Sequence, residues 1–152
     1  MVVIGFNLKK ILVERKEIIR GQVKVNTRMN ILDVKKEEIK LTAGKDVINF
    51  NFEFIITYVG VSDHTGNLAN IAFEGNVLYL VDPKDTKKIL EDWKKKEIEE
   101  EVRLKVLNTI LAKCNIKALV LEEEMGLPPH LPLPRFSETK SEKNKEKEEK
   151  KK

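Results

Sequence analysis

Residues 48–58, Ile48-Asn-Phe-Asn-Phe-Glu-Phe-Ile-Ile-Thr-Tyr58, show the clearest alternation of apolar and polar side chains in the chain. Apolar residues, most of them aromatic, stand at every second position: Ile48, Phe50, Phe52, Phe54, Ile56 and Tyr58. Successive side chains of a β-strand point to opposite faces, so this period of two predicts a strand with one face in a hydrophobic core. A sheet therefore has to form around this strand.

The sequence on either side predicts three more strands. Residues 4–15 alternate with a slip in phase at Lys9-Lys10, which is typical of a β-bulge. Residues 21–32 alternate as well, and residues 33–46 are charged and end in a turn signal. After a hairpin loop at 62–67, a fourth strand reaches Val81, and Gly75 within it indicates a bulge or a close backbone contact.

From Asp82 onward the period of the apolar residues becomes helical. Asp82-Pro83 predicts a helix start, in which the Asp82 side chain accepts backbone N–H groups and Pro83 takes the first helical position. A first helix is predicted from Pro83 to about Lys96, and a second from about Ile98 to a stop at Gly126. The order predicts the α+β class, with a four-stranded antiparallel sheet followed by long C-terminal helices.

The 152 residues are enough for one domain, which is predicted at residues 1–136. Residues 137–152 contain seven Lys, five Glu and no apolar side chain, so they are predicted to be a disordered tail. One cysteine cannot form an internal disulfide, and neither a secretory signal nor a membrane span is predicted. A cytoplasmic location is the expectation that follows.

Residues that could carry chemistry are few and scattered. His64 and His130 have no Cys or carboxylate at metal-ligand spacing, so no metal site is expected. Asp63-His64 is interpreted as part of a turn, and Cys114 as a small buried thiol on the apolar face of its helix. No glycine-rich phosphate loop precedes a helix, so neither an enzymatic activity nor a cofactor is expected.

The face of the predicted sheet opposite the aromatic residues carries apolar side chains of its own. By the period of two, Ile55, Val59, Leu78 and Leu80 point to this face and are interpreted as one apolar patch. Two interpretations remain open. A dimer partner or the chain's own C-terminal segment buries the patch permanently, or the patch receives the apolar residues of another polypeptide.

The second predicted helix is followed by Gly126-Leu-Pro-Pro-His-Leu-Pro-Leu-Pro-Arg-Phe136, which holds four of the five prolines. The order of the parts resembles the SecB-type export chaperones: four strands with a long gap before the third, Phe73-Glu74-Gly75 in the fourth, long helices and then this proline-rich stretch. Members of that family carry a stretch of the form Phe-Pro-x-Leu-x-Leu-x-Pro-x-x-Phe. Its apolar and proline positions correspond loosely to Leu127-Pro128, Leu131, Leu133-Pro134 and Phe136.

The resemblance implies an ATP-independent holdase that keeps non-native or precursor polypeptides from aggregating, for protein export. It also implies a homo-oligomer, a dimer or a dimer of dimers, in which strand one or its neighbour pairs across a dimer edge. The proline-rich stretch is expected to lie across the patch on the second face of the sheet. The implied client-binding residues are Ile55, Val59, Leu78, Leu80, Leu131, Leu133 and Phe136.

The sequence departs from the family's pattern at two places. Ser137 onward is too polar to form the amphipathic helix that follows the proline segment in the family. Conversely, the helix predicted from Pro83 to about Lys96, which contains Trp93, is longer than the family's crossover. We expect it to supply the missing wall of the binding groove.

Two other functions remain as alternatives. One is a dedicated adaptor chaperone that guards a single partner, such as an antitoxin, in place of many clients. The other is a non-enzymatic nucleic-acid or ribosome-associated protein that uses the lysines of the tail. The five glutamates among those lysines, and the nearly neutral charge of the remaining chain, argue against nucleic acid.

Overall fold

Four strands and two helices follow one another along the chain in the computed structural model, which describes residues 1–39, 44–61 and 66–137. The elements are β1 (Val2–Arg15), β2 (Val23–Glu37), β3 (Asp46–Gly60), β4 (Asn67–Val81), α1 (Pro83–Lys94) and α2 (Glu100–Met125). The structure thus confirms the predicted α+β class. Residues 62–65 of the predicted hairpin loop and residues 138–152 of the predicted tail lie outside the described residues.

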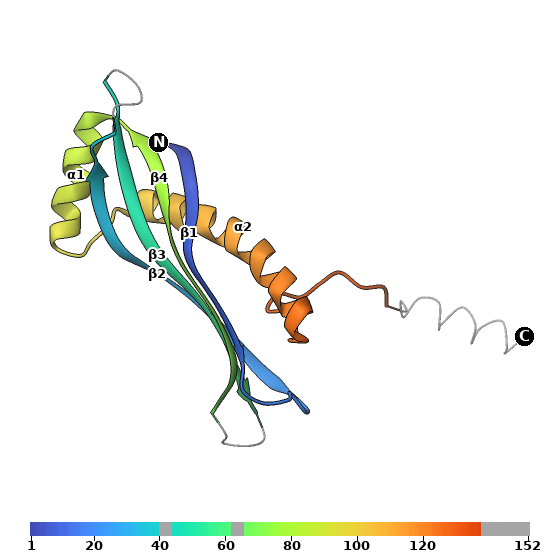
Figure 1. Ribbon diagram of the computed structural model, residues 1–152. Coiled ribbons are helices and arrows are strands. Elements are labelled where there is room, and N and C mark those ends of the chain that lie inside the picture. The colour runs from blue at the N-terminus through green and yellow to red at the C-terminus, as the bar shows by residue number, and fades with distance from the viewer. Residues whose placement is uncertain (40–43, 62–65, 138–152) are drawn as a thin grey trace, which may run out of the picture.

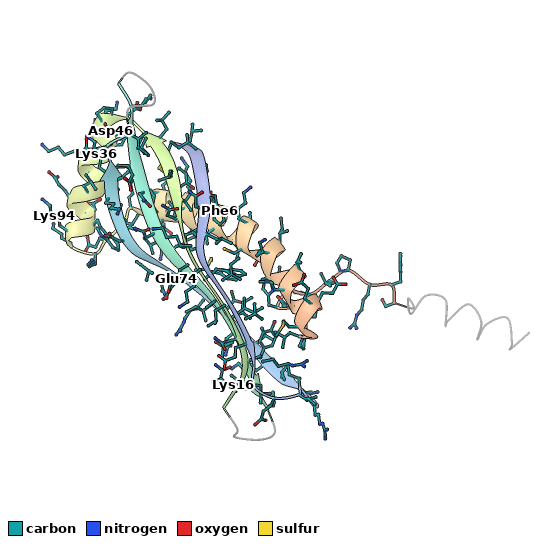
Figure 2. The ribbon with its side chains drawn as sticks, viewed as in Figure 1. Phe6, Lys16, Lys36, Asp46, Glu74 and Lys94 are labelled. Atoms are coloured by element: carbon teal, nitrogen blue, oxygen red, sulfur yellow. The ribbon has the colours of Figure 1, made fainter. Side chains whose placement is uncertain are left out.

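The sheet has the strand order β1-β4-β3-β2, and every neighbouring pair is antiparallel. The strands are long and twist together over their whole length (Figure 1). One end of the sheet carries the ion pair between Lys36 and Asp46, whose Nζ and Oδ1 atoms lie 3.5 Å apart, and the other end carries Lys16 (Figure 2). Because β3 and β4 are central, β1 and β2 form the two open edges.

The core lies on one face of β3 and β4. The six side chains of β3 that were predicted to be buried are 0% exposed. Phe54 stacks on Phe73 with ring centroids 5.8 Å apart, and Phe50 meets Tyr79 edge-on at 5.6 Å. Both helices cover this face, because Ile89 of α1 is in the core cluster and the Tyr79 hydroxyl donates to Lys105 O of α2 at 3.1 Å.

The phase slip predicted at Lys9 is confirmed as a bulge in β1. The register passes from Leu8 opposite Gly75 to Lys10 opposite Glu74, so Lys9 is the extra residue. A Cβ atom on Gly75 would lie 2.2 Å from Asn7 O, which is closer than two such atoms can approach. Gly75 therefore makes the close backbone contact that its place in the strand predicted.

The predicted end of β2 at residue 32 is wrong, because the strand continues to Glu37. A bulge in β2 falls between Ile31 and Asp33 and leaves Leu32 46% exposed. It shifts the phase so that Val34 returns to the core at 4% exposed. The bulge breaks the period of two, and the charged residues that follow then look like a loop.

Helix α1 begins at Pro83 as predicted, but the Asp82 side chain makes no hydrogen bond to the first helical turn. The Asp82 carboxylate instead pairs with the Lys45 ammonium, which stands next to it at the start of β3. This hydrogen bond, followed by the charge of Lys45, lowers the pKa of Asp82. The first turn is completed by Thr86, whose backbone N and Oγ1 donate to Asp82 O.

Helix α2 is one continuous helix of 26 residues and ends where Gly126 was predicted to stop it. Its buried residues recur every four positions along the side that faces the sheet: Val106, Ile110, Cys114, Ala118 and Glu122. Gly126 takes the left-handed conformation with φ of 64°, and Leu127 N donates to Glu122 O at 2.8 Å. The last residue of this buried stripe is a glutamate, which no apolar pattern would place there.

Candidate functional site

The second face of the sheet, which points away from both helices, carries the four apolar residues predicted for it. Ile55, Val59, Leu78 and Leu80 alternate along β3 and β4 with fully buried core residues and are half-buried themselves. On the neighbouring edge strand β1, Leu12 is paired with Ala72 and is 39% exposed. Apolar surface is therefore present on this face in the described chain.

The four residues form two groups and not one patch, so that part of the interpretation is wrong. Leu78 and Leu80 stand opposite Asn49 and Val47 near one end of the sheet, whereas Ile55 stands opposite Ala72. Ala72 and Leu78 are six positions apart in β4, or roughly 20 Å at about 3.3 Å per residue. The register of the strands separates the two groups, and residue types alone do not reveal it.

A belt of amide side chains lies between the two apolar groups. Asn7, Asn76 and Asn51 are aligned across β1, β4 and β3, and Asn49 lies beside them. Asn49 Nδ2 donates to Glu37 Oε1 at 2.7 Å. Within the described residues, Asn49 Oδ1 and Asn76 Oδ1 are buried without a hydrogen-bond partner. A continuous apolar contact along the whole face would have to cross this belt.

The proline-rich stretch does not lie on the second face, and this expectation is wrong. The Tyr58 hydroxyl, which points to the helix side of the sheet, donates to Pro128 O at 2.9 Å. Leu127 is 6% exposed within the core cluster, and the His130 ring stands edge-on to Phe54 with centroids 6.3 Å apart. The short turn at Gly126 delivers the chain to the face that α2 already covers.

The rest of the stretch leaves the body of the molecule (Figure 1). Leu131, Leu133 and Phe136 are 37%, 55% and 105% exposed. Leu133 borders an open groove beside α2, and the Phe136 ring is completely exposed. The seven residues proposed from the sequence are thus divided between the two faces of the sheet.

A buried polar cluster, which no pattern in the sequence predicted, holds the start of the stretch. His130 N donates to Glu122 Oε2 at 2.6 Å, and His130 Nδ1 is hydrogen-bonded to Glu122 Oε1. His130 Nε2 lies 2.8 Å from Asn115 Oδ1. The side chains of Glu122 and His130 are each 1% exposed. The signal that could have revealed the cluster is Glu122 itself, at the end of the apolar stripe of α2.

Tyr58 belongs to the same cluster. Burial, and then the charge of the Glu122 carboxylate, raise the pKa of the Tyr58 hydroxyl above its ordinary value. The hydroxyl therefore keeps its proton and acts as a donor. At the edge strand, Arg15 Nη1 donates to Met125 O at 2.9 Å and ties β1 to the end of α2.

An apolar groove of about 400 Å³ lies between α2 and the proline-rich stretch. Leu119 and Val120 border it on the helix, and Leu127, Pro129 and Leu133 border it on the stretch. The groove is open to solvent. Its walls suit the apolar side chains of a bound polypeptide.

Helix α2 also exposes apolar side chains on the side away from the sheet. Ile116 is 67% exposed and Val120, one turn later, is 50% exposed, and Leu104 near the start of the helix is 47% exposed. A helix that faces water on one side normally carries polar residues there. The apolar outer side of α2 therefore indicates a second contact surface, which continues into the groove at Val120.

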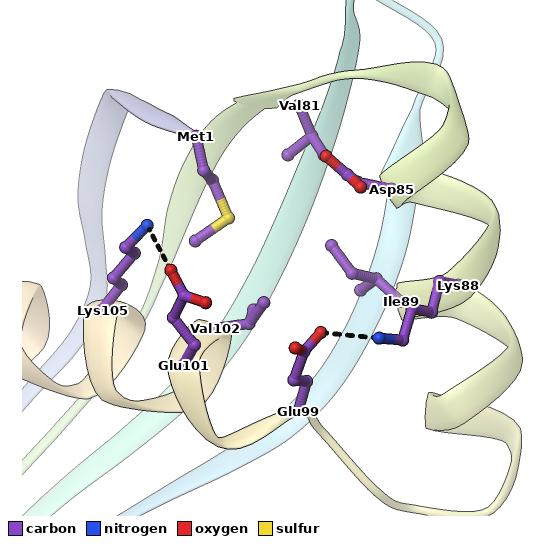
Figure 3. Close-up of a pocket in the computed structure, with 9 residues that line it drawn as sticks. All are labelled: Met1, Val81, Asp85, Lys88, Ile89, Glu99, Glu101, Val102 and Lys105. Atoms are coloured by element: carbon purple, nitrogen blue, oxygen red, sulfur yellow. Dashed lines mark hydrogen bonds and ion pairs between the residues drawn. The ribbon is translucent and has the colours of Figure 1, made fainter.

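Two further cavities of about 300 Å³ lie near α1 and the start of α2. The first lies between Met1, α1 and the start of α2 (Figure 3). Lys88 Nζ and Glu99 Oε2 pair beside it at 3.0 Å, and Lys105 Nζ and Glu101 Oε1 at 3.3 Å. The cavity therefore lies at a junction between the N-terminus, α1 and α2, with two ion pairs at its border.

The second of these cavities is bordered by Trp93 of α1, which was expected to supply a wall. Trp93 Nε1 donates to Asp33 Oδ1 at 3.2 Å, and Lys96 Nζ lies 4.5 Å from the centre of the ring. Ile31 and Leu107 border the same cavity. Trp93 thus forms a wall at the β2 edge, far along the sheet from the groove at the end of α2.

The residues that could carry chemistry are buried or lie outside the described part of the chain. Cys114 is 0% exposed, as predicted, and burial raises the pKa of its thiol to about 12. His64 lies outside the described residues. Within residues 1–39, 44–61 and 66–137, no group of three or more His, Cys, Asp or Glu side chains could hold a metal ion. In the same described part, neither helix is long and apolar enough to cross a membrane.

No protein-family model matches the chain, and no curated protein matches it. Among solved structures, the chain is similar to the Rv1957 SecB-like chaperone of Mycobacterium tuberculosis, which was solved in complex with a ChAD peptide from the Rv1956 HigA1 antitoxin. The sequence identity is 14% and the TM-score is 0.50, with 91% of each chain covered. At this identity the likeness concerns the fold. The chain has the fold of the SecB-like chaperones.

Proposed function

We propose that this chain is a molecular chaperone of the holdase type, which binds non-native polypeptides without a nucleotide and keeps them from aggregating. The observation that carries the proposal is the apolar groove of about 400 Å³ between α2 and the proline-rich stretch, which is open to solvent. The SecB-like fold supports it. Precursor polypeptides on the way to export are the client class that the family resemblance implies.

The energy of such binding favours many weak contacts over one strong contact. Burying roughly 400 Å² of a client's apolar surface is worth about 10 kcal/mol before costs, at about 25 cal/mol per Å². The entropy lost when a flexible client is ordered cancels much of that. Several sites on one oligomer raise the local concentration of sites along a long client, so oligomerisation is part of the proposed mechanism.

Two features of the described chain support a homo-oligomer, a dimer or a dimer of dimers. The outer edge of β1 presents 14 residues of unpaired strand, which is a template for pairing with a second chain. The outer side of α2 presents Ile116 and Val120. The solution mass of the purified protein, measured by light scattering, tests for the oligomer. A monomer at the concentrations used for activity assays would contradict the multivalent mechanism.

Aggregation of an unfolding client protein is the direct test of holdase activity. We expect the purified chain to suppress light scattering by a thermally unfolding client in the absence of ATP, and added ATP to change nothing. An unrelated protein of similar size and charge is the control. If a several-fold excess leaves the scattering unchanged, the chain is not a holdase.

A dedicated adaptor is the second candidate, because the similar Mycobacterium tuberculosis chaperone was solved with a peptide from a single antitoxin. The two functions differ in the breadth of partners. Capture on immobilised protein, followed by mass spectrometry, should recover many unrelated polypeptides for a general holdase. One dominant partner, recovered in a fixed ratio, would favour the adaptor.

A further inference from the structure

The start of the proline-rich stretch is held as a bound peptide would be held. We call residues 127–136 the strap. The Tyr58 hydroxyl donates to a backbone carbonyl, Pro128 O, at 2.9 Å. The Glu122 carboxylate accepts a backbone N–H, that of His130, at 2.6 Å. Leu127 fills an apolar position in the core at 6% exposed. One donor, one acceptor and one apolar position together recognise an extended backbone.

Most of the strap takes no part in this recognition. The buried contacts end at His130, and the exposed fraction then increases from 37% at Leu131 to 105% at Phe136. The strap is therefore fixed at its first four residues and free beyond them. Gly126, with its φ of 64°, is the point at which the chain leaves α2. A glycine there permits backbone changes that other residues resist.

The fixed part is anchored by a polar pair and not by apolar packing alone. Glu122 and His130 lose their contact with water when the strap is in place, and the hydrogen bonds between them and from His130 to Asn115 compensate for that loss. When the strap swings away, both groups recover water. A well-packed apolar anchor has no such compensation on opening, so a polar anchor makes opening easier.

We infer that Tyr58, Glu122 and the Leu127 position form a peptide-binding site that the strap occupies within its own chain, and that an extended segment of another polypeptide takes its place. The ligand is a segment with a leucine-like residue, a free carbonyl one residue later and a free N–H three residues after the leucine. Opening of the strap would also widen the groove beside α2, because Leu127, Pro129 and Leu133 move with it. The inference rests on the proposed function in one respect, that the competing segment belongs to a client.

A peptide with the strap's own sequence is the sharpest probe. Fluorescein-labelled Gly-Leu-Pro-Pro-His-Leu-Pro-Leu-Pro-Arg-Phe, titrated with the full-length chain, reports binding by fluorescence anisotropy. The variant His130→Ala removes both hydrogen bonds of the His130 ring and its contact with Phe54, and it leaves Tyr58 and Glu122 in place. We expect it to bind the peptide about tenfold more tightly than the wild type, because apparent affinity increases with the fraction of open sites.

Two controls make the result specific. Glu124→Gln, two residues from Glu122 and exposed, should bind the peptide as the wild type does. A peptide in which the leucine at position 2 and the histidine are both serine should bind His130→Ala at least about tenfold more weakly, since it lacks the apolar group and the ring. Equal affinity of wild type and His130→Ala for the original peptide would overturn the inference.

Hydrogen exchange on the unmodified chain gives a second measurement, which holds even if His130→Ala does not fold. If the strap opens by itself, the His130 amide exchanges at least about a hundredfold faster than the Phe54 amide of the core, through local opening. Addition of the unlabelled peptide should then accelerate His130 exchange further. Equal and slow exchange at both amides would mean that the strap opens only when the whole protein unfolds, which contradicts the inference.

The two proposals can fail separately. If the chain binds the peptide but does not suppress aggregation, the peptide-binding site under the strap is supported and the holdase function is refuted. If the chain suppresses aggregation but its His130 amide is as protected from hydrogen exchange as the Phe54 amide, the holdase function is supported and the peptide-binding site under the strap is refuted.

Discussion

The side chains of Glu122 and His130 are hydrogen-bonded to each other in the interior of the molecule, with 1% of each exposed to solvent. They are eight positions apart along the chain, with the turn at Gly126 between them. This pair joins the last turn of α2 to the proline-rich strap, and it connects both to the central strand through Tyr58.

The first prediction concerns the stability that this pair provides. His130→Ala should lower the free energy of unfolding by about 1–3 kcal/mol, because the buried Glu122 carboxylate loses a partner and water replaces it only after the strap loosens. Urea unfolding followed by circular dichroism measures the change. Glu124→Gln is the matched control and should stay within about 0.5 kcal/mol of the wild type. A His130→Ala variant as stable as the wild type would show that the pair contributes nothing.

The second prediction concerns the close contact between β1 and β4. Gly75→Ala would place a Cβ atom 2.2 Å from Asn7 O, and a backbone atom can move only if β1 moves. The free energy of unfolding of the variant should be lower by at least about 2 kcal/mol. Hydrogen exchange should be faster at the amides of β1 than at those of β3.

Gly5 provides the control for that experiment, because it lies on the same pair of strands. A Cβ atom there would lie 3.3 Å from Leu78 Cδ1, the end of a side chain that can turn aside. Gly5→Ala should therefore lower the free energy of unfolding by less than about 1 kcal/mol. Similar losses for both variants would mean that a general sensitivity of β1 explains the effect of Gly75→Ala.

The third prediction separates the two apolar surfaces. Leu78→Ser with Leu80→Ser alters the second face of the sheet, and Ile116→Gln with Val120→Gln alters the outer side of α2. We expect the first pair to weaken suppression of client aggregation at unchanged solution mass. The second pair should lower the solution mass and weaken suppression as a consequence, because fewer sites then act on one client.

Stability is the check on both double variants. Ile116 and Val120 are at least half exposed, so their replacement should change the free energy of unfolding by less than about 1 kcal/mol in total. If the Leu78 and Leu80 variant loses only stability and retains activity, the second face is a buried interface and not a client site.

The fourth prediction concerns the buried thiol. Burial raises the pKa of Cys114 to about 12, so the native chain has about a thousandfold less thiolate than an ordinary cysteine. Iodoacetamide at pH 8 should modify Cys114 in urea and leave it unmodified in the native protein. Rapid modification of the native protein would show that α2 separates from the sheet.

The same shift gives a dependence of stability on pH. Above the ordinary thiol pKa of about 8.5, the unfolded chain loses the Cys114 proton while the folded chain keeps it, so the free energy of unfolding decreases as pH rises. Between pH 8.5 and 10 the decrease should be smaller in Cys114→Ala than in the wild type. Equal slopes in urea titrations of the two proteins would contradict the pKa shift.

Local periodicity was enough to predict the architecture. The alternation along β3, the Pro83 helix start and the Gly126 stop are all signals within a few residues, and the structure confirms them. The extension of β2 was missed because the bulge at Leu32 breaks the period from which strands are recognised. Asp82 was assigned the wrong partner because Lys45, which is distant in sequence, competes for its carboxylate.

The candidate site was predicted less well, since it depends on relationships between strands and between distant segments. The register places Leu78 opposite Asn49 and so separates it from Ile55, although both residues point to the same face. The proline-rich stretch follows the turn at Gly126 onto the helix side, and no pattern within the stretch specifies this direction. The client-binding role of the seven residues proposed from the sequence stays a prediction.

The order in which the elements leave the ribosome follows from the position of α2. The aromatic face of β3 and β4 is covered mainly by a helix that ends at Met125, more than forty residues after the last strand at Val81. At about 5–20 residues per second of synthesis, this face remains uncovered for several seconds after the strands have emerged. During that interval the nascent chain presents the kind of surface that holdases bind. Under the proposed holdase function, nascent molecules of the protein are clients of the finished ones.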